Sequence, residues 1–98
     1  MNIKEVKVTE VGPRDGFQSE KTILKTEDKI DIINNLIEAG FPRIEVSSFV
    51  SPKAIPQLAD AESILSKVNR SSKTTLAALV PNSRGALRAV EAKLDQIV

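Results

Sequence analysis

Apolar and polar residues alternate at the start of this chain, and the pattern then changes period several times. The run "IKEVKVTEV" alternates residue by residue, which predicts a strand near residues 4–11. Two later runs, "RIEVSSFV" and "KTTLAALV", predict strands near 43–50 and 73–80. The last run is nearly apolar at its centre, as in a parallel sheet that is covered on both faces. We expect these strands to lie side by side in the order 1-2-3.

Helical periodicity separates the strands and predicts helices near 26–39, 58–69 and 83–93 on one side of the sheet. Each helix carries an apolar stripe that should face inward. The stripes are Ile30, Ile33, Leu36 and Ile37 in the first helix, Leu58, Ala61, Leu65 and Val68 in the second, and Leu87, Val90 and Leu94 in the third.

Residues that favour helix ends lie at the expected boundaries. Thr26 is a candidate N-cap for the first helix, and Gly40 is suited to end it. Asn82 or Ser83 is expected to cap the third helix.

Alternating strands and helices, at about 30 to 40 residues per unit, indicate an α/β fold with parallel strands and right-handed crossovers. A doubly wound sheet and an eightfold barrel are the two closed solutions, and no Gly-x-Gly-x-x-Gly follows the first strand. The barrel is therefore favoured. "LDQIV" turns apolar at Ile97 and Val98, as at the start of a fourth strand. We expect residues 1–98 to be the amino-terminal portion of a single TIM (β/α)8 barrel domain, holding about its first three βα units.

Charge and composition narrow the classes of function that this chain can have. Lys and Arg total 14 against 13 Asp and Glu, giving a net charge of +1, so no overall field attracts nucleic acid or an anionic membrane. No apolar run approaches the roughly 18 residues that span a bilayer. Without Cys there are no disulfides or thiolates, and a cytoplasmic location is expected. Without His as well, only carboxylates, Lys and Arg remain for catalysis.

The end of the first strand carries the most distinctive motif, "GPRDG". Arg14 and Asp15 are charged neighbours held between Pro13 and Gly16, and because the chain leaves strand geometry there, both can face one cavity. Glu45 lies between two β-branched residues of the second strand. Burying an ionised Glu is costly unless a cation meets it, so we expect an ion pair with Arg14. A surface position for all these charges is the alternative.

Three motifs in order, "VGPRDGFQSEK", "IEVSSFVSPKAIPQLAD" and "LVPN", resemble the amino-terminal part of the hydroxymethylglutaryl-CoA lyases. These lyases belong to a larger family of metal-dependent barrel enzymes with isopropylmalate synthase, homocitrate synthase and the pyruvate carboxyltransferases. The resemblance covers roughly residues 6–98. It implies that Arg14 lies over the thioester as a catalytic and substrate-binding residue, that Glu45 supports it in the catalytic site, and that Asp15 binds a divalent metal, Mg²⁺ or Mn²⁺. Gln18 and Ser48 match polar residues of the same substrate pocket.

The activity implied by this resemblance is cleavage of 3-hydroxy-3-methylglutaryl-CoA into acetoacetate and acetyl-CoA, by an enzyme that is a homo-oligomer at full length. The partner is then an acyl-CoA, with neither nucleic acid nor a membrane involved. The family's histidine and asparagine metal ligands and its catalytic cysteine lie on later segments, so the isolated chain should be inactive. A related condensing enzyme or carboxyltransferase, or a half-barrel that only associates with partners, remains an alternative.

Two further positions bear on the substrate. Phe17 stands where these lyases usually carry Leu, a difference that bears on the identity of the acyl group. Lys53 is either an anion contact for the CoA phosphates or a solvated loop residue.

Overall fold

A parallel sheet organises residues 8–98, the part of the chain that the computed structural model describes. Its strands lie in the order β1-β2-β3-β4, which confirms the predicted order and the predicted start of a fourth strand. Their bounds are β1 (Thr9–Glu10), β2 (Arg43–Ser48), β3 (Thr75–Leu79) and β4 (Gln96–Ile97). Residues 4–7 of the first predicted strand lie outside the described residues. All neighbouring strands pair in parallel, as repeated βα units require.

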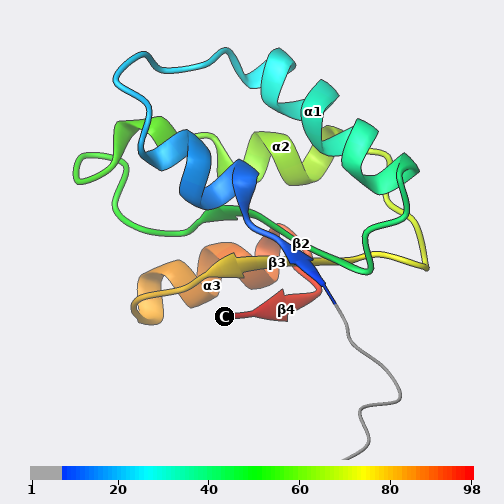
Figure 1. Cartoon of the computed structure of the whole chain (residues 1–98). Coiled ribbons are helices and arrows are strands. Elements are labelled where there is room, and N and C mark those ends of the chain that lie inside the picture. The colour runs from blue at the N-terminus through cyan, green and yellow to red at the C-terminus, as the bar shows by residue number, and fades with distance from the viewer. Residues whose placement is uncertain (1–7) are drawn as a thin grey trace, which may run out of the picture.

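Helices and helical turns follow each of the first three strands (Figure 1). Their bounds are η1 (Gly12–Gly16), α1 (Thr26–Glu38), η2 (Pro56–Leu58), α2 (Ala61–Lys67) and α3 (Ser83–Glu91). α1 and α2 lie side by side in Figure 1 and contact each other. The second predicted helix is shorter than expected, because a 3₁₀ turn precedes it and the backbone becomes extended at Val68. No helix within residues 8–98 combines the length and apolarity needed to cross a membrane.

One apolar core joins the helices to the outer face of the sheet. Ile33 of α1, Ile64 of α2 and Ala89 of α3 belong to it together with alternate residues of the strands, among them Ile44 and Leu76. This shared core agrees with the prediction that the helices cover one side of the sheet. Successive strand residues point to opposite faces, so the residues between these apolar positions face the other side, toward the barrel interior.

A β-bulge interrupts β2 where the site begins. Glu45 pairs with Ala77 and Ser47 with Ala78, so Val46 is the extra residue. Beyond the bulge Ser48 pairs with Leu79. Bulges commonly re-aim side chains beside functional sites. Here the bulge sets the direction of the Ser48 side chain at the carboxyl end of β2.

The predicted inward stripe of the third helix is wrong for two of its three residues. Leu87 is 63% exposed and Val90 is 71% exposed, whereas Leu94 is partly buried against the core. Gly85 and Ala89 form the buried face of α3 instead. A Cβ on Gly85 would lie 2.5 Å from the backbone oxygen of Phe49, so small residues allow α3 to approach the chain after β2 closely.

The helix ends agree with the sequence in two cases out of three. Gly40, the second residue after α1, has φ of +91°, a conformation that favours glycine. Asn82 caps α3, because its Oδ1 accepts a hydrogen bond from the backbone N–H of Gly85 at 2.8 Å. Thr26 does not cap α1. It is the first helical residue, and its hydroxyl donates to Asp60 across the fold at 2.6 Å.

Candidate functional site

The "GPRDG" motif forms η1, a short helical turn at the carboxyl end of β1. The backbone N–H of Asp15 donates to the Val11 carbonyl at 2.7 Å, and that of Ser19 donates to the Asp15 carbonyl at 3.2 Å. At the start of the turn, the N–H of Gly12 donates to Glu10 Oε1 at 3.0 Å. The sequence indicated that the chain leaves strand geometry here, but not that it forms a helical turn. The consequence is that Arg14 and Asp15 project from one hydrogen-bonded turn, with Gln18 two residues beyond its end.

Arg14 and Glu45 form the predicted ion pair. Arg14 Nε lies 3.0 Å from Glu45 Oε1, and the two side chains are 20% and 9% exposed. η1 and β2 contact each other closely, which brings together residues that are 31 positions apart in the sequence. The guanidinium therefore compensates the buried carboxylate. Because the carboxylate accepts the Nε–H, Arg14 still has N–H donors on its two Nη atoms, of which Nη1 lies 3.5 Å from Asp15 Oδ1.

Asp15 is the candidate metal ligand. Its side chain is 65% exposed, so its carboxylate oxygens are accessible to a cation. Within residues 8–98 no group of three or more His, Cys, Asp or Glu side chains is arranged to hold a metal ion. Mg²⁺ prefers an octahedral set of oxygen ligands. The residues present thus fit a divalent ion through a single carboxylate, and further ligands would have to come from other segments.

A pocket of about 320 Å³ lies at the carboxyl ends of the strands. The predicted substrate-binding residues Arg14, Gln18 and Ser48 all line it, so the fold brings them together. The other lining residues are mainly apolar: Val50, Ile55, Leu79, Val80, Pro81 and Val98. Lys53 does not line this pocket and is exposed. A few polar side chains among mainly apolar walls suit a small acyl group that carries oxygens.

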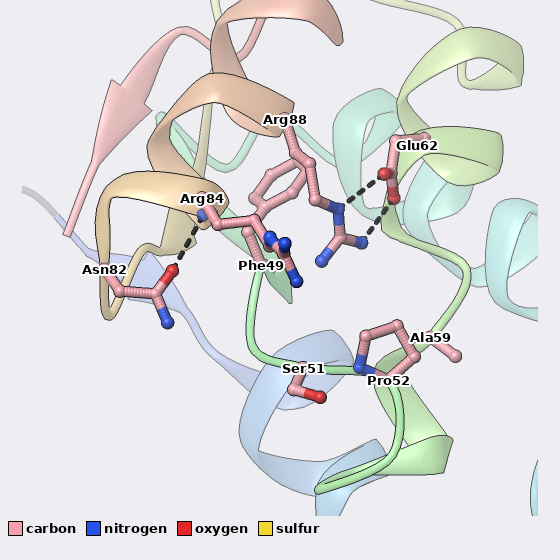
Figure 2. Close-up of a pocket in the computed structure, with 9 residues that line it drawn as sticks. Phe49, Ser51, Pro52, Ala59, Glu62, Asn82, Arg84 and Arg88 are labelled. Carbon is pink, nitrogen blue, oxygen red and sulfur yellow. Dashed lines mark hydrogen bonds and ion pairs between the residues drawn. The ribbon is translucent and has the colours of Figure 1, made fainter.

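A second Arg–Glu pair, which no local sequence pattern predicts, borders another pocket between α2 and α3 (Figure 2). Arg88 Nε and Nη2 each lie 2.7 Å from an oxygen of Glu62, and Nη1 donates to the Val50 carbonyl at 3.2 Å. The Arg88 guanidinium also lies over the Phe49 ring, 5.3 Å from its centre. Its hydrogen bonds to Glu62 hold the pKa of that carboxyl below its usual value, and Glu62 raises the pKa of Arg88.

Comparison with known proteins identifies the family. A sequence model of the HMGL-like family matches residues 5–98, nearly the whole chain. The chain belongs to the HMGL-like family. Among its relatives are the mitochondrial hydroxymethylglutaryl-CoA lyase of Arabidopsis thaliana, 46% identical over 96% of this chain and 20% of the relative, and the lyase YngG of Bacillus subtilis, 47% identical over 95% of this chain and 31% of the relative.

Solved structures of HMG-CoA lyases superimpose closely on the fold. The Bacillus subtilis enzyme gives a TM-score of 0.93 at 46% identity, covering 97% of this chain and 32% of that protein. An Acinetobacter baumannii enzyme, solved with coenzyme A and 3-methylmalate, gives 0.93 at 47% identity, covering 99% of this chain and 32% of that protein. The architecture is therefore part of a TIM barrel, and the chain spans at most about a third of the relatives it matches. Those relatives include mitochondrial and bacterial proteins, so they do not fix a compartment.

Proposed function

We propose that this chain supplies the amino-terminal part of a hydroxymethylglutaryl-CoA lyase and carries the first half of its acyl-CoA site. The observation that carries the proposal is the Arg14–Glu45 pair at 3.0 Å, at the edge of a pocket that Gln18 and Ser48 also line. Membership of the HMGL-like family and about 46% identity to named lyases support the same reaction.

The reaction breaks the carbon–carbon bond between C2 and C3 of the acyl group. The C3 hydroxyl gives up its proton and becomes the ketone of acetoacetate, while the bonding electrons pass to C2 and form the enolate of acetyl-CoA. C2 then takes up a proton to complete acetyl-CoA. Negative charge thus develops on the thioester oxygen during the cleavage. A fixed cation beside that oxygen lowers the barrier, because its attraction grows as the charge forms.

Arg14 is suited to this task. A guanidinium stays protonated at any ordinary pH, so it stabilises an enolate oxygen without giving up a proton to it. Glu45 accepts the Nε–H and holds the planar group in one orientation, which leaves the Nη donors available on the pocket side. In this proposal Gln18 and Ser48, which line the same pocket, hydrogen bond the oxygens of the acyl group.

A divalent metal, Mg²⁺ or Mn²⁺, fits the site with Asp15 as one ligand, and when bound it would supply Lewis acidity toward the substrate's hydroxyl and carboxylate. The exposed carboxylate of Asp15 is the contribution of this chain.

Residues 1–98 are, in this proposal, one portion of a single barrel domain. The exposed apolar side chains Leu87, Val90 and Ile97, together with the open outer edge of β4, support packing of a further βα unit there. Assembly of the full-length enzyme as a homo-oligomer remains a prediction.

A chimera tests the proposed function. Residues 1–98 replace the matching segment of the Bacillus subtilis lyase, and acetoacetate release from 3-hydroxy-3-methylglutaryl-CoA is measured beside the unmodified enzyme. The closely similar backbones, with a TM-score of 0.93, favour correct folding of the exchange. We expect lyase activity from the chimera and none from the 98-residue chain alone. A chimera that folds, judged by circular dichroism, but releases no acetoacetate would refute the proposal.

A further inference from the structure

Lys29 is a buried cation that lies outside the proposed site. It belongs to the first turns of α1, is 1% exposed, and reaches across to η2 and to Asp60, directly before α2. Its Nζ lies 3.0 and 3.2 Å from the two carboxylate oxygens of Asp60 and donates to the Gln57 carbonyl at 2.5 Å. The ammonium group is therefore fully engaged with one neighbouring segment.

A contribution to stability does not by itself explain why the Lys29 ammonium group is buried. Removing an ammonium from water costs several kcal/mol, and replacing a buried ion pair by apolar residues of similar size is often neutral or stabilising. The start of a helix also disfavours positive charge, and the first turn of α1 otherwise carries Glu27 and Asp28. Conformational specificity is the better-attested use of such a group.

The contacts of this cluster lead to η1. Lys29 Nζ lies 6.0 Å from the centre of the Phe17 ring, directly after η1. Gln57, whose carbonyl binds Lys29, donates from its side-chain Nε2 to the Glu20 carbonyl at 3.1 Å. The segment 17–20 is thus held at both of its ends. Beyond it, the chain up to Thr26 has no helix or strand to fix its course.

We infer that Lys29 is a positioning residue for η1: with Asp60 and Gln57 it fixes the turn so that Arg14 stays on Glu45. What Arg14 then does rests on the proposed function, but the positioning itself does not. Phe17 is the contact between the cation and the turn, which gives this position a structural role. Neither Phe17 nor Lys29 lines the substrate pocket.

The test follows the Arg14 Nε–H in the ¹⁵N NMR spectrum of the 98-residue chain, with Arg14→Lys identifying the signal. A guanidinium N–H that is held by a carboxylate exchanges slowly with water. We expect Lys29→Met to raise its exchange rate roughly tenfold or more, because local opening of η1 becomes easier. Lys29→Arg should restore part of the protection. Lys25→Met, an exposed lysine one turn earlier, is the matched control and should change nothing.

A second amide separates positioning from loss of the whole fold. The backbone N–H of Leu76 in β3 donates to Asp95 Oδ2 at 2.9 Å, far along the sheet from η1. The proposal requires Arg14 to lose protection while Leu76 keeps it. Equal loss at both, an unchanged Arg14 signal, or an unmodified chain in which Arg14 is unprotected would each overturn it.

Gln57→Leu keeps the test decisive if Lys29→Met does not fold. It removes only the hydrogen bond to the Glu20 carbonyl and leaves the ion pair between Lys29 and Asp60. We expect a smaller loss of protection at Arg14 in this variant, and no loss would count against the proposal. None of these readouts involves catalysis, so an inactive chimera would refute the proposed function and leave this inference standing.

Discussion

Two Arg–Glu pairs join distant segments of this chain. Their geometry distinguishes the Arg14–Glu45 pair of the candidate site from the Arg88–Glu62 pair, which we call the brace because it connects structural elements. Arg88 meets Glu62 through two hydrogen bonds of 2.7 Å and gives its remaining Nη1 to the Val50 carbonyl. Arg14 meets Glu45 through Nε at 3.0 Å, and its Nη1 lies 3.5 Å from Asp15. All three nitrogens of the Arg88 guanidinium therefore donate to protein groups. Arg14 leaves its Nη2 without a partner among residues 8–98, and it lines the same pocket as Gln18 and Ser48.

The surroundings of the two pairs also differ in a way that separates a structural role from a functional one. Arg88 lies over the Phe49 ring and ties α2, α3 and the chain after β2 together (Figure 2), which is what a structural brace does. Arg14 stands on η1 at the carboxyl ends of the strands, the face on which TIM barrels carry their sites. An Arg–Glu pair is therefore not informative by its presence. A guanidinium nitrogen without a protein partner, such as Nη2 of Arg14 among residues 8–98, is informative.

We expect the largest effect on turnover from Arg14→Met. A small effect would contradict the assignment of Arg14 to the catalytic site. In the chimera we expect turnover to fall by about 10²- to 10³-fold, because a preorganised donor to the developing enolate is lost. Acetoacetate release measures this loss. The matched variant Arg84→Met removes an exposed arginine that lines only the other pocket, and it should leave turnover within about twofold. Equal losses in the two variants would show that Arg14 acts through folding alone.

Asp15→Asn should have the next largest effect. The carboxylate is exposed, so its loss should leave the fold intact, while affinity for Mn²⁺ falls by about ten- to a hundredfold in the chimera. Calorimetric titration with Mn²⁺ measures the affinity, and Asp31→Asn, an exposed aspartate on α1, serves as the control. Unchanged Mn²⁺ affinity would remove Asp15 from the metal site.

Much of the fold could be predicted because its signals are local. The change of apolar period from two to three or four residues marked each strand and helix, and Gly40 and Asn82 marked two helix ends. The Arg14–Glu45 contact also followed from the sequence. A carboxylate between apolar strand residues needs a cation, and neighbouring parallel strands bring their carboxyl ends to one edge.

The features that could not be predicted from the sequence depend on tertiary packing. Leu87 and Val90 have the spacing of a buried stripe, yet they are exposed because Gly85 and Ala89 permit a closer approach on another face of α3. The Arg88–Glu62 pair depends on how two helices are placed side by side, which no local pattern encodes. No local pattern indicated the burial of Lys29 either, because its partners Gln57 and Asp60 lie 28 and 31 positions away in the sequence.

Gly85→Ala should lower stability by disturbing the packing around the Arg88–Glu62 brace, without touching the Arg14–Glu45 pair. The added Cβ would lie 2.5 Å from the Phe49 backbone oxygen, so α3 must shift. Overpacking costs about 1–3 kcal/mol, and alanine recovers up to about 1 kcal/mol of helix propensity, so we expect a net loss of about 1–2 kcal/mol in the free energy of unfolding. Urea unfolding of the 98-residue chain measures it.

The control is the same change in open space. Gly16→Ala adds a Cβ with no atom within 4 Å, and Gly16 has no positive φ, so its stability should not fall. If Gly85→Ala is as stable as Gly16→Ala, the close approach of α3 is not what selects glycine.

The smallest expected effect is the pH dependence of the stability that the Arg88–Glu62 brace contributes. The hydrogen bonds from Arg88 lower the pKa of Glu62 from its ordinary value of 4.5. The unfolded chain therefore binds a proton more readily than the folded one, so the stabilisation is complete above pH 4.5 and disappears as pH falls through the folded pKa. Because the Glu62 side chain is 47% exposed, the pair should contribute no more than about 1 kcal/mol.

Glu62→Gln should accordingly destabilise the chain by a constant amount at neutral pH and by less at each step below pH 4.5, where the parent's own Glu62 becomes protonated. Urea midpoints of both proteins at several pH values measure the difference. Glu91→Gln, at an exposed glutamate of α3 with no ion pair among residues 8–98, should track the parent at every pH. A Glu62→Gln deficit that grows as the solution is acidified would contradict the sign of the pKa shift, and with it the view that the hydrogen bonds from Arg88 stabilise the charged carboxylate.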